Sequence, residues 1–141
     1  MAIRTDIGTP TPMSVAPMRR YGLLLGAALS GSAVVYHFVS GNTEVMVPLY
    51  AADLPPEVTA VLDIVWYDIA LLAAIGAIGM LVAAYRPAWR MPLAWFIGGH
   101  YLALALLCLG FSFAWFGNPW DLIQWVIFGP IALITIWAAR G

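Results

Sequence analysis

The sequence contains few charged residues and a single cysteine. Asp, Glu, Lys and Arg make up 9% of its 141 residues, against roughly 25% in an average soluble domain. This scarcity, together with a hydrophobic fraction of 63%, argues against a soluble enzyme, a nucleic-acid-binding protein and a disordered linker. The lone Cys108 excludes an internal disulfide and a Cys-x-x-Cys redox pair. We therefore interpret the chain as an integral membrane protein whose partner is the lipid bilayer, with no nucleic-acid partner.

Four long apolar runs follow an N-terminal stretch rich in Thr and Pro. The fold class predicted from them is all-α, an integral membrane four-helix antiparallel bundle, because a membrane-spanning helix needs about 20 apolar residues. Residues 1–18 are predicted to be a disordered cytoplasmic tail, and residues 19–141 a four-span membrane domain. The predicted spans cover residues 21–39, 58–85, 92–115 and 121–139. The second run exceeds the length needed, so it should tilt, bend at Gly76 or Gly79, or project beyond the lipid.

The arginines mark one side of the predicted spans. Five of the six flank span ends that an antiparallel bundle brings together, namely Arg19, Arg20, Arg86, Arg90 and Arg140. The connecting segments at the opposite end, residues 40–57 and 117–121, contain no arginine. By the positive-inside rule, both termini and the turn at residues 86–91 face the cytoplasm. The sequence thus predicts a multi-pass protein of the bacterial inner (plasma) membrane.

The first apolar run has an alternative interpretation as a cleavable signal peptide. Arg19 and Arg20, the run itself and Gly31-Ser32-Ala33 follow the order of an n-region, an h-region and a cleavage site. The run at residues 21–39 has the length of a membrane span rather than that of an h-region. We therefore favour its retention as the first span.

The segment between the first two spans is long for a small bundle. Its residues 45–50 are apolar, and we expect the segment to fold back over the bundle mouth or to lie in the headgroup layer. We expect Asp53 to accept hydrogen bonds from the first amides of the second helix. Glu57 suits the positive end of that helix, so both acidic residues have a structural explanation.

Small residues repeat at intervals of four in the first span, at Gly22, Gly26 and Ser30. This spacing lets helix backbones approach closely, so that dispersion and weak hydrogen bonds hold the helices together. One interpretation is a homodimer that forms through this face. The other, which we favour, is contact within the chain's own bundle.

Ionisable residues inside a membrane span are costly, so each is a candidate functional residue. A rise of about 1.5 Å per residue, counted from the cytoplasmic arginines, places His37, Asp68 and Gln124 at heights of about 24 to 27 Å. Asp63 lies on the same helix as Asp68 and nearer to water. The hypothesis is an ion or proton site formed by these residues around a His37–Asp68 pair. The simpler alternative, which we favour, is that the pair only ties the first helix to the second.

His100 and Cys108 are the candidates for cofactor binding. Cys108 lies at about the level of His37, whereas His100 lies about 10 Å lower, near the middle of the bilayer. This difference argues against a bis-histidine haem within one chain. A histidine pair or His–Asp pair alone cannot hold zinc, which takes four ligands. We predict no cofactor, no metal site and no catalytic residue.

The stretch from Pro48 to Val58, with the pattern Pro-Leu-x-Ala-x-Asp-Leu-Pro-Pro-x-Val, is followed by Trp66. The chain resembles small bacterial four-span integral membrane proteins of unassigned function, and the likeness covers most of the sequence after residue 20. This resemblance implies the four-span fold and no particular chemistry. Small multidrug exporters differ, because they carry a glutamate in their first span and residues 21–39 contain none.

Three functions fit these observations. The first is an accessory or assembly subunit of a larger membrane complex, which we favour because the chain has few ionisable groups and no soluble domain. The second is a small dimeric proton- or ion-coupled transporter or channel that uses the His/Asp cluster. The third is a membrane protein that binds a cofactor or acts as an enzyme, although no residue pattern indicates catalysis.

Overall fold

The chain is helical along most of its length, as a computed structural model of residues 17–140 shows. No strand occurs among these residues, so the predicted all-helical fold is confirmed. The elements are α1 (Pro17–Gly41), the π-helix η1 (Asn42–Met46), α2 (Val47–Ala51), α3 (Pro56–Tyr85), α4 (Pro87–Phe116) and α5 (Trp125–Ala139). Most of the predicted tail at residues 1–18 lies outside the described residues.

Three helices are long and apolar enough to cross a membrane. They are the continuous helix Pro17–Ala51, which joins α1, η1 and α2, and the helices Pro56–Tyr85 and Pro87–Phe116. α5 is apolar but shorter, with 15 residues. The length and composition of the three long helices agree with the prediction of a membrane protein.

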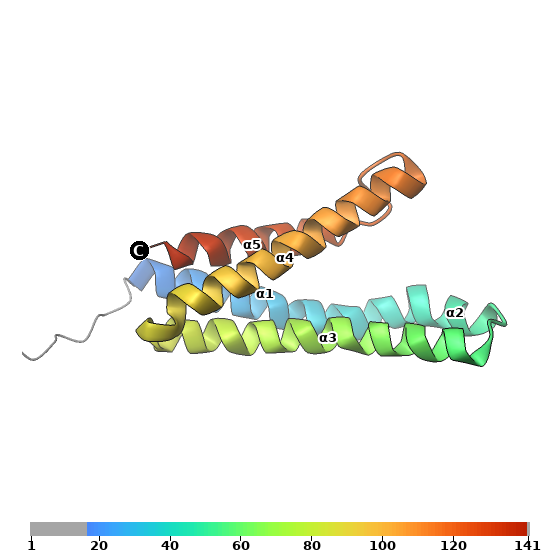
Figure 1. Cartoon of the computed structure of the whole chain (residues 1–141), viewed down its shortest axis with the longest axis horizontal. Helices are drawn as coiled ribbons and strands as arrows, with labels where there is room; N and C mark the ends of the chain where they lie inside the picture. The colour runs from blue at the N-terminus through green and yellow to red at the C-terminus, as the bar shows by residue number, and fades with distance from the viewer. Residues whose placement is uncertain (1–16, 141) are drawn as a thin grey trace, which may run out of the picture.

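The helices form two antiparallel hairpins that diverge from a common end (Figure 1). α1 pairs with α3, and α4 pairs with α5; contacts of α3 with α4 and of α1 with α5 join the two hairpins. The start of α1, the turn between α3 and α4 and the end of α5 lie together at one end (Figure 1). The hairpins separate toward the opposite end, where α2 turns into α3.

The prediction that residues 40–54 form an external loop, folded back over the bundle mouth or lying in the headgroup layer, is wrong. The first helix continues through η1 and α2 to Ala51, and only residues 52–55 interrupt it before α3. Met46 within this extension is only 3% exposed. The hydroxyl of Tyr50 also donates a hydrogen bond to Asp63 Oδ1 at 2.8 Å. The helix thus continues well beyond residue 39, where the predicted first span ends.

The turn before α3 also differs from the expectation. Pro55 occupies the N-cap position and no side chain caps the helix, so Asp53 does not have the predicted capping role. Asp53 instead has a φ of 50°, a left-handed conformation in which Asp is enriched. It therefore reverses the chain between α2 and α3. Glu57 does lie in the first turn of α3, where its charge complements the helix dipole.

The last helix begins later than the predicted span at residues 121–139. Residues 117–124 form turns, and α5 begins at Trp125. α4 ends because Gly117 takes a φ of 72°, which costs glycine little. The helical part of the fourth run is therefore about 22 Å long.

Side chains satisfy the backbone of this turn segment. Ser112 Oγ is fully buried, donates to Asn118 O at 2.7 Å and accepts from Leu122 N at 3.2 Å. The indole nitrogen of Trp125 donates to Pro119 O at 2.7 Å. The turn therefore meets its own hydrogen-bonding needs without a regular helix.

The small-residue face of α1 is filled by other helices of the same chain. A Cβ atom added at Gly22 would lie 2.9 Å from the ring of Trp137, and one at Gly26 would lie 2.8 Å from Met80 Sδ. Ser30 on the same face is fully buried. Gly22, Gly26 and Ser30 thus form the within-chain contact that the sequence left as one of two alternatives.

α4 and α5 pack tightly against each other at Gly98. A Cβ atom at Gly98 would lie 2.6 Å from the side chain of Ile136 and 3.3 Å from Ala132 O, whereas one at the adjacent Gly99 would meet nothing within 4 Å. Both glycines therefore lie within α4, but only Gly98 is packed against a neighbouring helix. They form a matched pair for testing this contact.

We expect Gly98→Ala to lower the free energy of unfolding by about 1 to 3 kcal/mol, because α5 must move away from the added methyl group. Gly99→Ala should leave stability unchanged or raise it by up to about 1 kcal/mol, through the higher helix propensity of Ala. Equilibrium unfolding in a mixed detergent measures both. Equal effects of the two substitutions would contradict this packing.

Candidate functional site

Positive and negative side chains occupy opposite ends of the described structure. The arginines of residues 17–140 lie where the hairpins converge: Arg19, Arg20, Arg86, Arg90 and Arg140. The acidic residues of the same range lie toward the diverging ends: Glu44, Asp53, Glu57, Asp63, Asp68 and Asp121. At the basic end, the guanidinium group of Arg20 lies 4.4 Å from the ring centroid of Tyr85. The candidate polar residues of α3 thus belong to the acidic half of the molecule.

His37 joins α1 to α3 through Trp66. Its Nε2 atom lies 3.0 Å from Trp66 O, and its ring stacks on the indole with centroids 3.7 Å apart and an interplanar angle of 24°. Gly41, one turn farther along α1, leaves room for this indole, since a Cβ there would lie 2.6 Å from it. The contacts of His37 are therefore those of a helix-to-helix tie.

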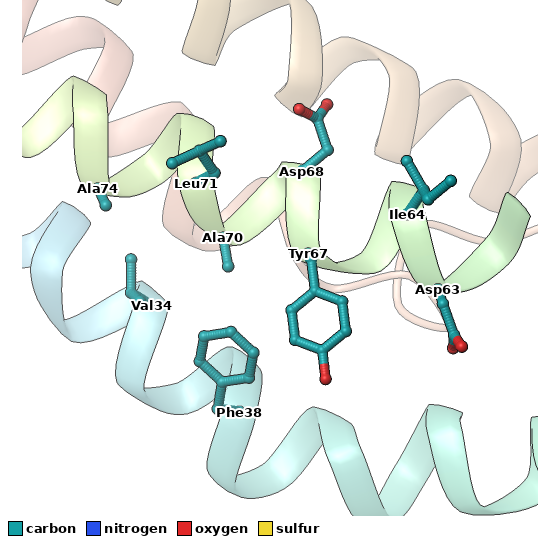
Figure 2. Close-up of a pocket in the computed structure, with 9 residues that line it drawn as sticks. All are labelled: Val34, Phe38, Asp63, Ile64, Tyr67, Asp68, Ala70, Leu71 and Ala74. Atoms are coloured by element: carbon teal, nitrogen blue, oxygen red, sulfur yellow. The ribbon is translucent and has the colours of Figure 1, made fainter. Parts of the chain in front are cut away.

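The predicted pair of His37 with Asp68 is not assembled. The contacts of His37 are made with Trp66 and Phe38, and within residues 17–140 no ion pair links it to Asp68. Figure 2 shows Asp68 on the side of α3 opposite to Tyr67 and Asp63. The tie between α1 and α3 therefore exists, but it uses a backbone carbonyl instead of the carboxylate.

Asp63 and Asp68 instead border a groove between α1 and α3 with a volume of about 650 Å³. Asp63 and Tyr67 point toward α1, whereas Asp68 lies on the opposite rim (Figure 2). The remaining lining is apolar and consists of Val34, Phe38, Ile64, Ala70, Leu71 and Ala74. This groove is the candidate site. Its lining is mostly apolar, with Asp63 at one end and Asp68 part-way along α3.

The other predicted site residues lie outside this groove. Gln124 is exposed and precedes α5 without capping it. Cys108 is a half-buried free thiol. His100 is half-buried with its Nε2 atom buried and without a hydrogen-bond partner among the described residues. Within residues 17–140, no group of three His, Cys, Asp or Glu side chains is placed to hold a metal ion.

The sequence analysis missed a buried polar junction between the hairpins. Ser30 Oγ on α1 donates to Ala73 O on α3 at 2.7 Å and is hydrogen-bonded to the hydroxyl of Tyr101 on α4. Gly76 allows this approach, since a Cβ there would lie 3.0 Å from the Tyr101 hydroxyl. The signal that could have found the junction is Tyr101 itself, because a buried tyrosine hydroxyl usually has a hydrogen-bond partner.

α5 joins the junction through Thr135, which is fully buried. Its hydroxyl donates to Ile131 O at 2.6 Å within α5 and lies 3.2 Å from Met80 Sδ on α3. The same hydroxyl would lie 3.2 Å from a Cβ at Gly26 on α1. The polar groups of the junction therefore connect all four helices: Ser30 and Tyr101 join α1, α3 and α4, and Thr135 places α5 against α3 and α1.

No known protein family matches this sequence, and no curated protein or solved structure shows significant similarity to it. The resemblance to small bacterial four-span proteins therefore stays a prediction. The function has to be argued from the placement of the chain's own residues.

Two double-mutant cycles distinguish the observed contacts from the predicted pair. We expect His37→Phe and Asp68→Asn to have additive effects on the free energy of unfolding, because residues without shared partners do not couple. Ser30→Ala and Tyr101→Phe should couple by about 0.6 kcal/mol and at most about 1.7 kcal/mol, the mean and the maximum measured for hydrogen bonds between membrane helices. Unfolding titrations of each single and double variant measure both. A coupled first pair or an additive second pair would contradict the described geometry.

Proposed function

We propose that the chain spans the bacterial inner membrane four times, as an antiparallel bundle with both termini in the cytoplasm. The support is the apolar character of its helices and the gathering of arginines at one end. α5 is shorter than a usual span, but the preceding turn satisfies its own backbone groups. Non-helical backbone is tolerated at membrane depth where protein groups satisfy it.

Within this frame, we propose that the protein is an accessory or assembly subunit of a larger membrane complex. The observation that carries the proposal is the length of the first hairpin. The helix Pro17–Ala51 has 35 residues and α3 has 30, so they extend about 52 and 45 Å. The hydrocarbon core is only about 30 Å thick. The hairpin therefore projects roughly 15 Å or more beyond the external face of the hydrocarbon core.

The projecting part, residues 42–61, is called the external tip below. Its apolar side chains are exposed, with Val47 at 59%, Tyr50 at 57% and Val61 at 59%. Apolar groups gathered outside the lipid mark an interaction surface. The tip also carries Glu44 and Glu57 among its acidic residues and contains no arginine or lysine. Its partner is expected to be a membrane protein with an apolar and basic external surface.

The alternative of a proton- or ion-coupled transporter has less support. It requires His37 and Asp68 to share a site, and the imidazole of His37 is engaged with Trp66. The space between the helices at the level of Ser30 is also taken up by packed side chains, among them Ala27, Met80 and Tyr101. We therefore rank the subunit role above transport and above cofactor binding.

Site-specific photo-crosslinking in native membranes tests the subunit role. A photoreactive amino acid at Val47 or at Val61 should form an adduct with the same membrane protein, because both positions lie on the external tip. The matched control is Ile78, which is 61% exposed but lies at lipid depth, and it should label only lipid. Glu44→Lys with Glu57→Lys should reduce the tip adduct, since it reverses the charge facing a basic partner.

The subunit role would be contradicted if the tip positions labelled only lipid or a second copy of this chain. Adducts with unrelated proteins at the two tip positions would also argue against one docking surface. Mass spectrometry of the purified adducts distinguishes these results.

A further inference from the structure

The groove between α1 and α3 runs along the outer half of the proposed bilayer. Counted from Arg86, Ala74 lies about 18 Å and Asp63 about 34 Å above the cytoplasmic boundary. The groove therefore reaches from the external headgroup level to near the middle of the membrane. The groove has a volume of about 650 Å³ and lies on the surface of one hairpin. Lipid in the proposed bilayer can therefore enter it directly.

The deep part of the groove is apolar. Val34 and Phe38 on α1 face Ala70 and Ala74 on α3 (Figure 2). The two alanines leave space between the helices where larger side chains would fill it. An elongated apolar channel along the direction of the helices matches the shape of a lipid acyl chain.

The shallow end of the groove is negative and aromatic. Asp63 points into it, and the Tyr50 hydroxyl fixes one carboxylate oxygen at 2.8 Å. The rings of Phe38 and Tyr67 lie 6.0 Å apart beside it, and such faces attract cations. Asp68 adds a second negative charge on the rim. Within residues 17–140 no cationic side chain pairs with either carboxylate, and the arginines lie at the far end of the molecule.

We propose that this groove binds a phospholipid whose headgroup carries a primary ammonium group. The acyl chain occupies the apolar channel, and the ammonium group donates hydrogen bonds to Asp63 beside the two aromatic rings. Charge complementarity selects this occupant, because an anionic headgroup would meet the Asp63 carboxylate and no basic residue among those that line the groove. The proposal goes beyond the subunit role. The residues that line the groove lie outside the external tip, and the one tip residue it uses is Tyr50, through its hydrogen bond to Asp63.

Native mass spectrometry of the full chain in detergent tests this site. Phosphatidylethanolamine and phosphatidylglycerol with identical acyl chains are added separately, and the bound fractions are compared. We expect phosphatidylethanolamine to bind at least fivefold more tightly. Asp63→Asn should bring the two affinities within twofold of each other, because it removes the charge that selects the ammonium group.

Two further variants keep the test specific. Glu57→Gln removes a carboxylate from the same helix outside the groove, and it should retain the fivefold preference. Ala74→Phe fills the apolar channel and should weaken binding of both lipids, while circular dichroism checks that each variant stays folded. Equal binding of the two lipids by the unsubstituted chain would overturn the proposal. A preference that survives Asp63→Asn would overturn it as well, as would equally tight binding of phosphatidylcholine, whose quaternary ammonium group cannot donate.

Discussion

The absence of water from the hydrocarbon core of a bilayer is the constraint on which this structure depends. A polar group at that depth is costly unless it finds a partner within the protein. Ser30 and Tyr101 meet this requirement together at the place where the two hairpins join, and Thr135 meets it within its own helix. Small residues such as Gly26 and Gly76 permit the close approach that these bonds need. The hairpins are free to diverge above this level because the junction holds them together below it.

The helices themselves could be predicted from the sequence, since long apolar runs admit few other structures. The extension of the first helix to Ala51 could not, because it is accompanied by the burial of Met46 and by the hydrogen bond from Tyr50 to Asp63 on α3. These contacts join residues from different helices, and no local pattern encodes them. The late start of α5 has a similar cause, since Ser112 holds the preceding turn through bonds across the chain.

In the candidate site, too, some features could be predicted from the sequence and others depend on how the helices pack. Counting residues gave the height of each polar group but not the direction in which it points around its helix. His37 and Asp68 were therefore paired on height alone, although Asp68 faces away from the side of α3 that carries Tyr67. Asp63 and Asp68, two of the predicted site residues, both border the groove. The groove itself depends on how α1 and α3 pack, which the sequence does not specify.

The proposed orientation connects these features, because it puts the arginines in the cytoplasm, the groove in the outer leaflet and the tip outside. Cysteine labelling in intact cells tests it most directly. In a Cys108→Ser background, Glu44→Cys should react with a membrane-impermeant maleimide, whereas Arg140→Cys should react only after the membrane is permeabilised. Labelling of residue 140 in intact cells, with residue 44 protected, would contradict the account.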